Sequence, residues 1–100
     1  HKGATMLDDR YAITASEREK IIATYFDETE FIKQFPSKEK RKIVVLSVLA
    51  QKFDPKKNYS EAAVNDVLKQ AITDYVTVRR YLIEYGFMQR TKDGKTYWLT

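Results

Sequence analysis

The chain has 100 residues, 43% of them hydrophobic, and a formal net charge of +4 at pH 7. This length corresponds to one ordinary domain, and the apolar fraction is high enough to form one core. The absence of cysteine excludes disulfides and thiolate metal sites, and a single histidine, His1, excludes a catalytic triad or a histidine zinc site. We therefore expect a protein that is not an enzyme and that needs no cofactor or metal.

The sequence contains neither a recognisable membrane span nor an export signal. Its longest apolar stretch, residues 43–50, is much shorter than the roughly 20 residues that cross a bilayer. Residues 1–5 lack the apolar segment of a signal peptide. We therefore predict a cytoplasmic protein without a membrane partner. Residues 1–15 are expected to be a tail that is disordered or foreign to the natural protein, and residues 16–100 a single domain.

Positive charge is concentrated in the middle of the chain. Residues 1–36 carry five basic and seven acidic side chains, residues 37–57 carry seven and two, and residues 58–100 carry six and five. A local basic excess suits a polyanionic partner, because clustered cations neutralise its phosphates. The alternative is that lysine-rich helix ends only increase solubility, and the charge pattern alone does not separate the two interpretations.

The first predicted helix extends from Ser16 to about Phe26. Ser16 and Glu19 have the Ser-x-x-Glu spacing of a capping box, in which the hydroxyl and the carboxylate each bond a free backbone N–H. The segment Thr29–Phe35 is predicted to be a short strand or an extended segment that ends before Pro36, because Pro36 disfavours a helical conformation in the residue before it. The domain is thus expected to begin with a helix followed by an extended segment.

A second helix is predicted from Ser37, as its N-cap, to about Lys52. Its apolar residues occupy more than one face, which indicates a central position in the core. Asp54–Asn58 is predicted to be a turn, because it contains aspartate, proline and asparagine. Tyr59 is then expected to form a strand of one or two residues.

Two further helices are predicted close together in the chain. Ser60 is the expected N-cap of a helix to about Ala71, and Asp74 that of a helix to about Tyr85. Gly86 should end the later helix, because glycine readily adopts the left-handed conformation that closes a last turn. Two helices at this spacing are typical of a helix-turn-helix.

A β-hairpin is predicted after these helices. Phe87–Thr91 and Thr96–Leu99 are its expected strands, and Asp93-Gly94 is its expected turn, because both turn residues tolerate positive φ. Tyr97 and Trp98 are expected to pack in a small core. The order of elements predicts an α+β winged helix-turn-helix: a three-helix core and a C-terminal hairpin wing, with an extra N-terminal helix and an extra short strand.

Several stretches of the sequence resemble a known family. They are Phe35–Lys42 (FPSKEKRK), Tyr59–Asn65 (YSEAAVN), Asp74–Leu82 (DYVTVRRYL), Asp93-Gly94 and Tyr97-Trp98. Their order and spacing resemble the bacterial domain-of-unknown-function family numbered two thousand and eighty-seven, which occurs alone and as the C-terminal part of ArsR-like transcriptional regulators. The resemblance implies a winged-helix-like domain in a setting of bacterial transcription regulation, and it implies no particular catalytic or binding residues.

Three groups of residues are candidates for DNA binding. Basic side chains crowd the N-terminus of the 37–52 helix, where free N–H groups also attract phosphate. In a winged helix the 74–85 helix enters the major groove, and basic residues on the wing suit phosphate contact. The predicted DNA-binding residues are Lys38, Lys40, Arg41, Lys42, Thr77, Arg79, Arg80, Tyr81, Arg90, Lys92 and Lys95.

Each group also has a purely structural interpretation. The cations of the 37–52 helix can form a solvated face, and lysines on a hairpin can protect a sheet edge. Arginines of the 74–85 helix can form surface ion pairs with nearby carboxylates, for which the candidates are Asp66, Asp74 and Glu84. Asn65 is expected to be structural, bonding the backbone of the turn.

The sequence predicts a double-stranded DNA-binding module of a bacterial transcription regulator, acting as a homodimer because one such module covers a short half-site. This prediction requires the three basic groups to lie together on one cationic surface. The alternative is a winged helix that serves protein interaction, dimerisation or effector response without binding DNA.

Overall fold

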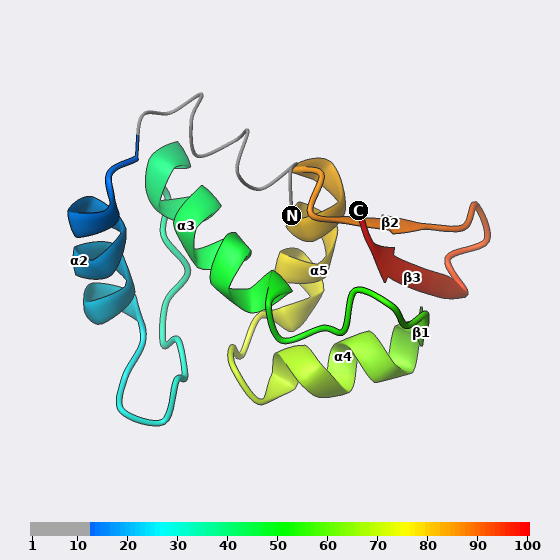
Figure 1. The fold of residues 1–100 in the computed structure, drawn as a ribbon. Coiled ribbons are helices and arrows are strands. Elements are labelled where there is room, and N and C mark those ends of the chain that lie inside the picture. Colours follow the sequence, from blue (N-terminus) through cyan, green and yellow to red (C-terminus); the bar gives the residue numbers. More distant parts are fainter. Residues whose placement is uncertain (1–12) are drawn as a thin grey trace.

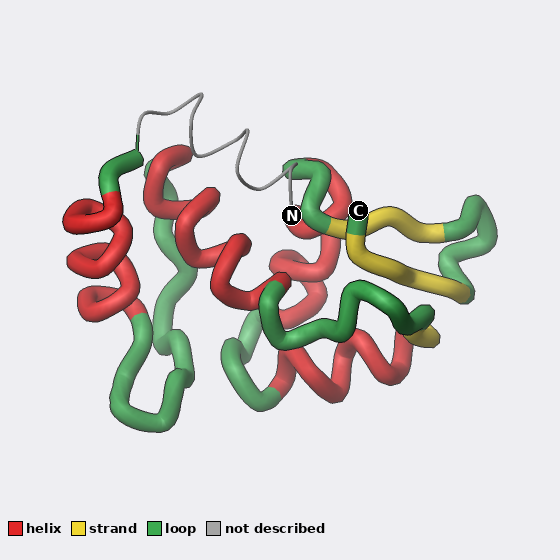
Figure 2. The backbone as a smooth tube through the Cα atoms, in the orientation of Figure 1, coloured by secondary structure: helices red, strands yellow, loops and turns green. Residues whose placement is uncertain are grey.

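The computed structural model describes residues 13–100. Figures 1 and 2 show α2 at one end of the molecule and the small sheet at the other, with α3 extending between them. Most of the predicted tail, residues 1–15, lies outside the described residues. The elements in chain order are α2 (Ala15–Tyr25), α3 (Glu39–Ala50), β1 (Tyr59–Ser60), α4 (Glu61–Lys69), α5 (Tyr75–Glu84), β2 (Met88–Arg90) and β3 (Thr96–Leu99).

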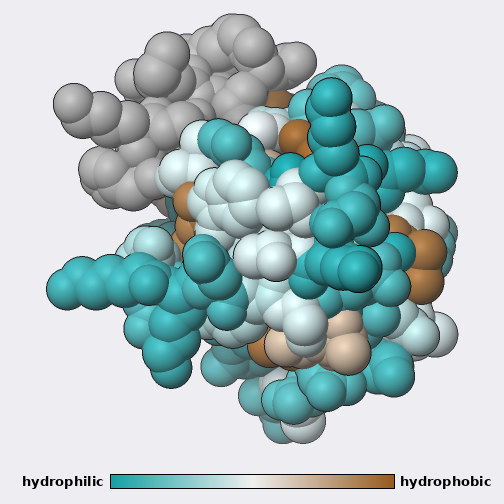
Figure 3. All heavy atoms as spheres, turned by 90° about the vertical axis from the view of Figure 1, so that its right-hand side faces the viewer, coloured by the Kyte–Doolittle hydropathy of each residue, from teal (hydrophilic) through white to brown (hydrophobic). Residues whose placement is uncertain are grey.

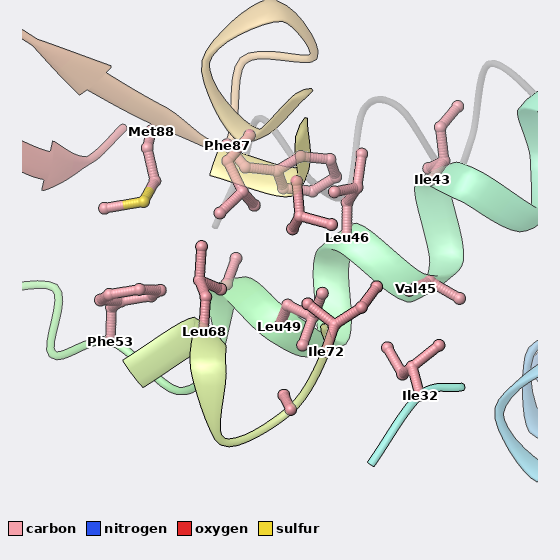
Figure 4. Close-up of a cluster of buried hydrophobic side chains, with 14 of the residues drawn as sticks. Ile32, Ile43, Val45, Leu46, Leu49, Phe53, Leu68, Ile72, Phe87 and Met88 are labelled. Atoms are coloured by element: carbon pink, nitrogen blue, oxygen red, sulfur yellow. The ribbon is translucent and has the colours of Figure 1, made fainter. Parts of the chain in front are cut away.

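Helix α3 is the centre of the core, as predicted. Seven of its twelve residues are buried, and both α2 and α5 pack against it. Figure 4 shows that the cluster of buried side chains also draws on α4, on the loop after α4 and on the start of the hairpin. The buried Ser47 donates its hydroxyl to the Val44 carbonyl at 2.7 Å, so burial leaves no unpaired hydroxyl there.

Helix α2 uses a different cap from the predicted one. Thr14 is its N-cap, and the Thr14 hydroxyl accepts a hydrogen bond from the backbone N–H of Glu17 at 3.1 Å. Ser16 lies inside the first turn, so the predicted box of Ser16 and Glu19 is wrong. Thr14 and Glu17 have the same spacing as that pair, and spacing alone cannot choose between two overlapping matches.

Between α2 and α3 the chain makes a turn at residues 28–29 and isolated β-bridges at Ile32, and no strand forms over the predicted range 29–35. The Asp27 carboxylate accepts hydrogen bonds from the backbone N–H groups of Thr29 and Phe31, at 2.8 and 3.0 Å. Ile32 forms isolated β-bridges and is fully buried. A carboxylate that binds nearby N–H groups competes with strand pairing, and this explains the difference.

Helix α3 begins one residue later than predicted. Lys38 and not Ser37 occupies its N-cap position, and the Lys38 side chain makes no capping hydrogen bond. Pro36 is buried while Ser37 is exposed. Ser37 therefore belongs to the link between a buried proline and the helix, and the predicted cap is wrong.

The helix-turn-helix follows the prediction closely. Ser60 caps α4 by accepting a hydrogen bond from the backbone N–H of Ala63 at 3.1 Å, and it is also the last residue of β1. Asp74 occupies the N-cap of α5, although its side chain makes no capping bond. Gly86 adopts φ +81° just beyond α5, as expected for a residue that closes a helix.

The sheet has three strands in the order β1-β3-β2, and both pairs are antiparallel. In the middle strand, Tyr97 is paired with Tyr59 of β1 and with Arg90 of β2. The predicted hairpin turn at Asp93-Gly94 is present: Gly94 has φ +72°, whereas Asp93 does not use the positive φ that it tolerates. The reason is that the connection between β2 and β3 is longer than two residues.

Helices α3, α4 and α5 together with the sheet form the three-helix core and hairpin wing of a winged-helix arrangement. The predicted α+β fold is thus confirmed, with α2 as the extra helix packed against α3. Within residues 13–100 no helix is both long enough and apolar enough to cross a membrane.

Candidate nucleic-acid interface

A groove of about 510 Å³ lies between α5, the start of α4 and the hairpin. Helix α5 faces this groove with the side opposite its core stripe, in which Val78 and Leu82 are fully buried. The structure therefore brings the outward side of the predicted recognition helix next to the wing. Four of the predicted DNA-binding residues line the groove, namely Thr77, Arg79, Arg80 and Arg90.

Arg79 is held by α4. Its guanidinium donates a hydrogen bond to the side-chain oxygen of Asn65 at 2.5 Å and lies 3.8 Å from the Glu61 carboxylate. Only 18% of the Arg79 side chain is exposed. The sequence suggested other carboxylates as partners and a backbone partner for Asn65, so both details differ. Arg79 therefore mainly fixes α4 against α5.

Arg80 is the more accessible arginine of α5. It is exposed, and its guanidinium carbon lies 5.9 Å from the centre of the Tyr81 ring. Thr77 is half-buried on the same groove. Arg80 can thus offer several N–H donors to a ligand in the groove, and Thr77 can offer a hydroxyl.

The hairpin turn is organised around Asp93. Its carboxylate accepts hydrogen bonds from the Thr91 hydroxyl at 2.6 Å and from the Lys95 backbone N–H at 3.0 Å. These two bonds, the hydroxyl first, lower the pKa of the Asp93 carboxyl below its ordinary value. The turn therefore keeps a negative charge between Lys92 and Lys95, which are both exposed.

Arg90 connects the sheet to this turn. Its guanidinium donates to the backbone carbonyls of Thr91 and Lys92, at 3.2 and 3.4 Å. Gly94 lies beside this guanidinium, and a Cβ there would only make an ordinary contact with it at 3.5 Å. Arg90 is thus placed at the edge of the groove by its own turn.

Carboxylates interrupt the positive charge of the groove. Glu61, Glu84 and Asp93 line it together with its three arginines. The Glu61 carboxylate faces Arg79, and the Asp93 carboxylate accepts hydrogen bonds within the turn. Glu84 lies on the outward side of α5. The groove is therefore a surface of mixed charge, with cations at the wing tip and at Arg80.

The basic N-terminus of α3 lies elsewhere. Figure 1 shows it at the end of the molecule opposite the hairpin, next to α2. The Lys40 ammonium is 2.9 Å from the Glu17 carboxylate of α2, and the Arg41 guanidinium donates to the Tyr25 hydroxyl at 3.3 Å. This Lys40 bond is the main reason that the pKa of Glu17 is lowered. The expected single cationic surface is therefore not formed.

Tyr81 and Lys42 belong to an aromatic cluster away from the groove. The Tyr81 ring stacks on Phe35, with centres 5.4 Å apart, and meets Tyr85 edge-on. The Lys42 ammonium lies 5.0 Å from the centre of the Tyr81 ring and 3.9 Å from the Glu39 carboxylate. Both residues thus have contacts within the chain, and Tyr81 is not among the residues that line the groove.

Two apolar residues, Val76 of α5 and Trp98 of β3, lie outside the core cluster. Val76 is 51% exposed and lines the groove. Trp98 was expected in the core with Tyr97, but alternation along β3 places them on opposite faces. Tyr97 is buried, whereas Trp98 is half-buried and outside the core cluster.

Figure 3 shows the end of the molecule that carries the hairpin. The surface in this view is mostly hydrophilic, and hydrophobic residues form only small, separate patches. No group of three His, Cys, Asp or Glu residues within 13–100 is arranged to hold a metal ion. This end of the molecule is therefore a polar surface with a few apolar features.

A comparison with protein families gives a match over residues 31–99 to the model described as "Uncharacterized protein conserved in bacteria (DUF2087)". The matched stretch contains every element from α3 to β3 and leaves out α2. Comparisons with curated proteins and with solved structures gave no match. The family suggested by the sequence is thereby confirmed, and the chain belongs to the bacterial family DUF2087.

Proposed function

We propose that the chain is a double-stranded DNA-binding module of a bacterial transcription regulator. The observation that carries this proposal is the groove, in which the outward side of α5 and the tip of the hairpin form one continuous surface. Helix α5 would lie in the major groove, and the hairpin would contact the adjacent backbone. The proposal places the protein in the bacterial cytoplasm, where this partner is found.

The residues of the groove and the exposed lysines of the adjacent hairpin turn divide into two roles. Arg80 and Thr77 read bases, because a guanidinium can bond guanine in a bidentate way and a hydroxyl can bond several base edges. Lys92, Lys95 and Arg90 neutralise phosphates, which gives affinity without sequence preference. Glu84 lies on the outward side of α5 and limits the approach of phosphates to that part of the helix.

The cations of α3 are not needed for this footprint. Lys40 pairs with Glu17 of α2, whereas Lys42 pairs with Glu39 and lies over the Tyr81 ring, and neither lines the groove. A homodimer remains part of the proposal, since two copies would place their α5 helices in successive major grooves about 34 Å apart.

The first test is the affinity for duplex DNA as a function of salt, measured by fluorescence anisotropy. Three phosphate contacts predict a slope of log K against log salt of about −2.7. Failure to bind any duplex at low salt would reject the proposal. A slope near zero would also reject it, because phosphate neutralisation would then not contribute.

A second test compares two variants that remove the same charge from opposite ends of the molecule. The double variant Lys92→Gln and Lys95→Gln should weaken all duplexes alike and reduce the slope by about 2. The matched control, Lys38→Gln with Arg41→Gln, should leave the affinity nearly unchanged. Equal losses in the two variants would show that net charge and not the wing controls binding.

The sequence preference is tested separately with Arg80→Ala. Loss of a bidentate contact to guanine costs about 1–3 kcal/mol of discrimination at one base pair, with a smaller effect on non-specific duplexes. A competition assay with a pool of single-base variants measures this directly. An unchanged preference would assign reading to other residues.

A protein partner is the second candidate, and the mixed charge of the groove favours it. Three carboxylates beside three arginines suit a polar protein surface better than a uniform polyanion. The salt titration separates the two, since a protein-interaction module would not bind duplex DNA even at low salt.

A further inference from the structure

Val76 is the one large hydrophobic side chain that is exposed within residues 13–100, at 51%. A single exposed valine has no meaning by itself, but its position is informative. It is the second residue of α5, and it lines the groove beside Thr77 and Arg80. The core stripe of α5 is complete without it, because Val78 and Leu82 are fully buried. Val76 is therefore available to a ligand in the groove.

We infer that Val76 reads thymine, by packing its methyl groups against the C5-methyl group of that base. This inference rests on the proposed docking of α5 in the major groove, where residues near the start of the recognition helix contact base edges. The C5-methyl of thymine is the apolar group that the major groove of DNA presents, and small apolar side chains recognise it by contact. Valine has no side-chain donor or acceptor, so a hydrogen-bonded base edge gains nothing from it.

The surroundings of Val76 favour a methyl group over an apolar protein surface. Arg79, Arg80 and Glu84 share the groove with it, so the apolar area there is small. In Figure 3, likewise, hydrophobic residues at the hairpin end appear only as small separate patches. A hydrophobic protein partner needs a wider patch, whereas one methyl group needs a single aliphatic side chain between polar readers.

The experiment begins by selecting the preferred duplex from a random pool with the unmodified chain. Each thymine of that duplex is then replaced by deoxyuridine, which lacks only the C5-methyl group. Anisotropy should show a loss of affinity of about fourfold at one thymine, the effect of one buried methyl-sized group. In Val76→Ala the difference between the two duplexes should shrink, because both γ-methyl groups that contact the thymine methyl are lost.

Ile83→Ala is the matched control, since Ile83 lines the groove near the other end of α5 and should keep the methyl preference. Val76→Thr, which keeps one methyl group at nearly the same size, should retain part of the preference. Circular dichroism establishes that each variant is folded. If Val76→Ala were unfolded, Val76→Thr would carry the comparison alone, and an undiminished preference in it would overturn the inference.

The remaining outcomes are distinct from one another. Failure of every duplex to bind overturns both the proposed function and this inference. Binding to a selected duplex without thymine, or without any effect of deoxyuridine, overturns the inference alone. A preference that persists unchanged in Val76→Ala does the same, since another residue would then contact the methyl group.

Discussion

Arg79 illustrates how contacts within the fold can engage a side chain of the predicted recognition helix. Its guanidinium bonds Asn65 and faces Glu61, both from α4, and little of it reaches solvent. An arginine on the outward side of a predicted recognition helix looks like a base reader in the sequence. Its neighbour Arg80 is exposed instead. Which of two adjacent arginines is free depends on the packing angle of α4 and α5, and no sequence pattern gives that angle.

Asn65→Ala should destabilise the chain by about 1–3 kcal/mol, because it removes a hydrogen bond to a charged group that is mostly buried. Urea unfolding followed by circular dichroism measures this difference. Asp66→Ala, an exposed neighbour on the same helix, is the control and should change stability by less than about 0.5 kcal/mol. Equal effects of the two substitutions would mean that the bond to Arg79 contributes little.

The hairpin turn gives a pH-dependent prediction at the same scale. The pKa of Asp93 is lowered in the folded chain, mainly by the Thr91 hydroxyl. The ionised carboxylate therefore stabilises the fold above its unfolded pKa, and this contribution is lost as the pH falls through the folded pKa. Thr91→Val should raise the pKa of Asp93 toward its ordinary value, as measured by an NMR titration of the carboxyl carbon. An unchanged pKa would contradict the assigned cause.

At the scale of elements, the sequence predicts which helices and strands exist, and in what order, better than it predicts the residues at which they begin and end. The sequence predicts Ser60 correctly as a cap, because an extended residue, Tyr59, comes before it and apolar residues at helical spacing follow it. Ser37 was not a cap because the buried Pro36 anchors the chain before it. No strand forms around Ile32, which makes only isolated bridges, because Asp27 binds the nearby N–H groups of Thr29 and Phe31. In each case a local side-chain or packing interaction decided between patterns that look alike in the sequence.

Two substitutions at the start of α2 can distinguish the observed N-cap, Thr14, from the predicted one, Ser16. Thr14→Ala should lower the free energy of unfolding by about 1 kcal/mol, because the N–H of Glu17 loses its acceptor. Ser16→Ala should have little effect or stabilise slightly, since Ser16 is in the helix interior, where alanine is favoured. Urea unfolding of both variants measures this, and the reverse order of effects would restore the predicted cap.

At the scale of the whole molecule, the course of α3 decides which predicted site residues come together. This helix starts beside α2 and ends toward the sheet, a length of about 18 Å for its twelve residues. Its basic N-terminus is therefore far from the hairpin. Thr77, Arg80 and Arg90 do converge, because a helix-turn-helix followed directly by a hairpin returns the chain beside α5. The sequence could predict the second result from connectivity, but the first depends on the direction of α3.

The single tryptophan allows a test of whether the domain unfolds as one cooperative unit. Trp98 lies in β3, whose neighbour Tyr97 is buried in the same core as α3, α4 and α5. Urea unfolding followed by Trp98 fluorescence should therefore coincide with unfolding followed by circular dichroism of the helices. Leu46→Ala in α3 should shift both transitions together, by about 2–5 kcal/mol. A separate fluorescence transition would mean that the hairpin unfolds on its own.

The placing of β3 between β1 and β2 has a consequence for synthesis on the ribosome. Both outer strands pair only with β3, and β3 is translated after them. At translation rates of about 5–20 residues per second, β1 waits roughly 2–8 seconds for its neighbour. During that interval α2 and α3 can already associate, while the nascent sheet has no template. The groove, which is lined by residues of β3 and of the turn before it, therefore cannot be complete until the last strand of the domain has been made.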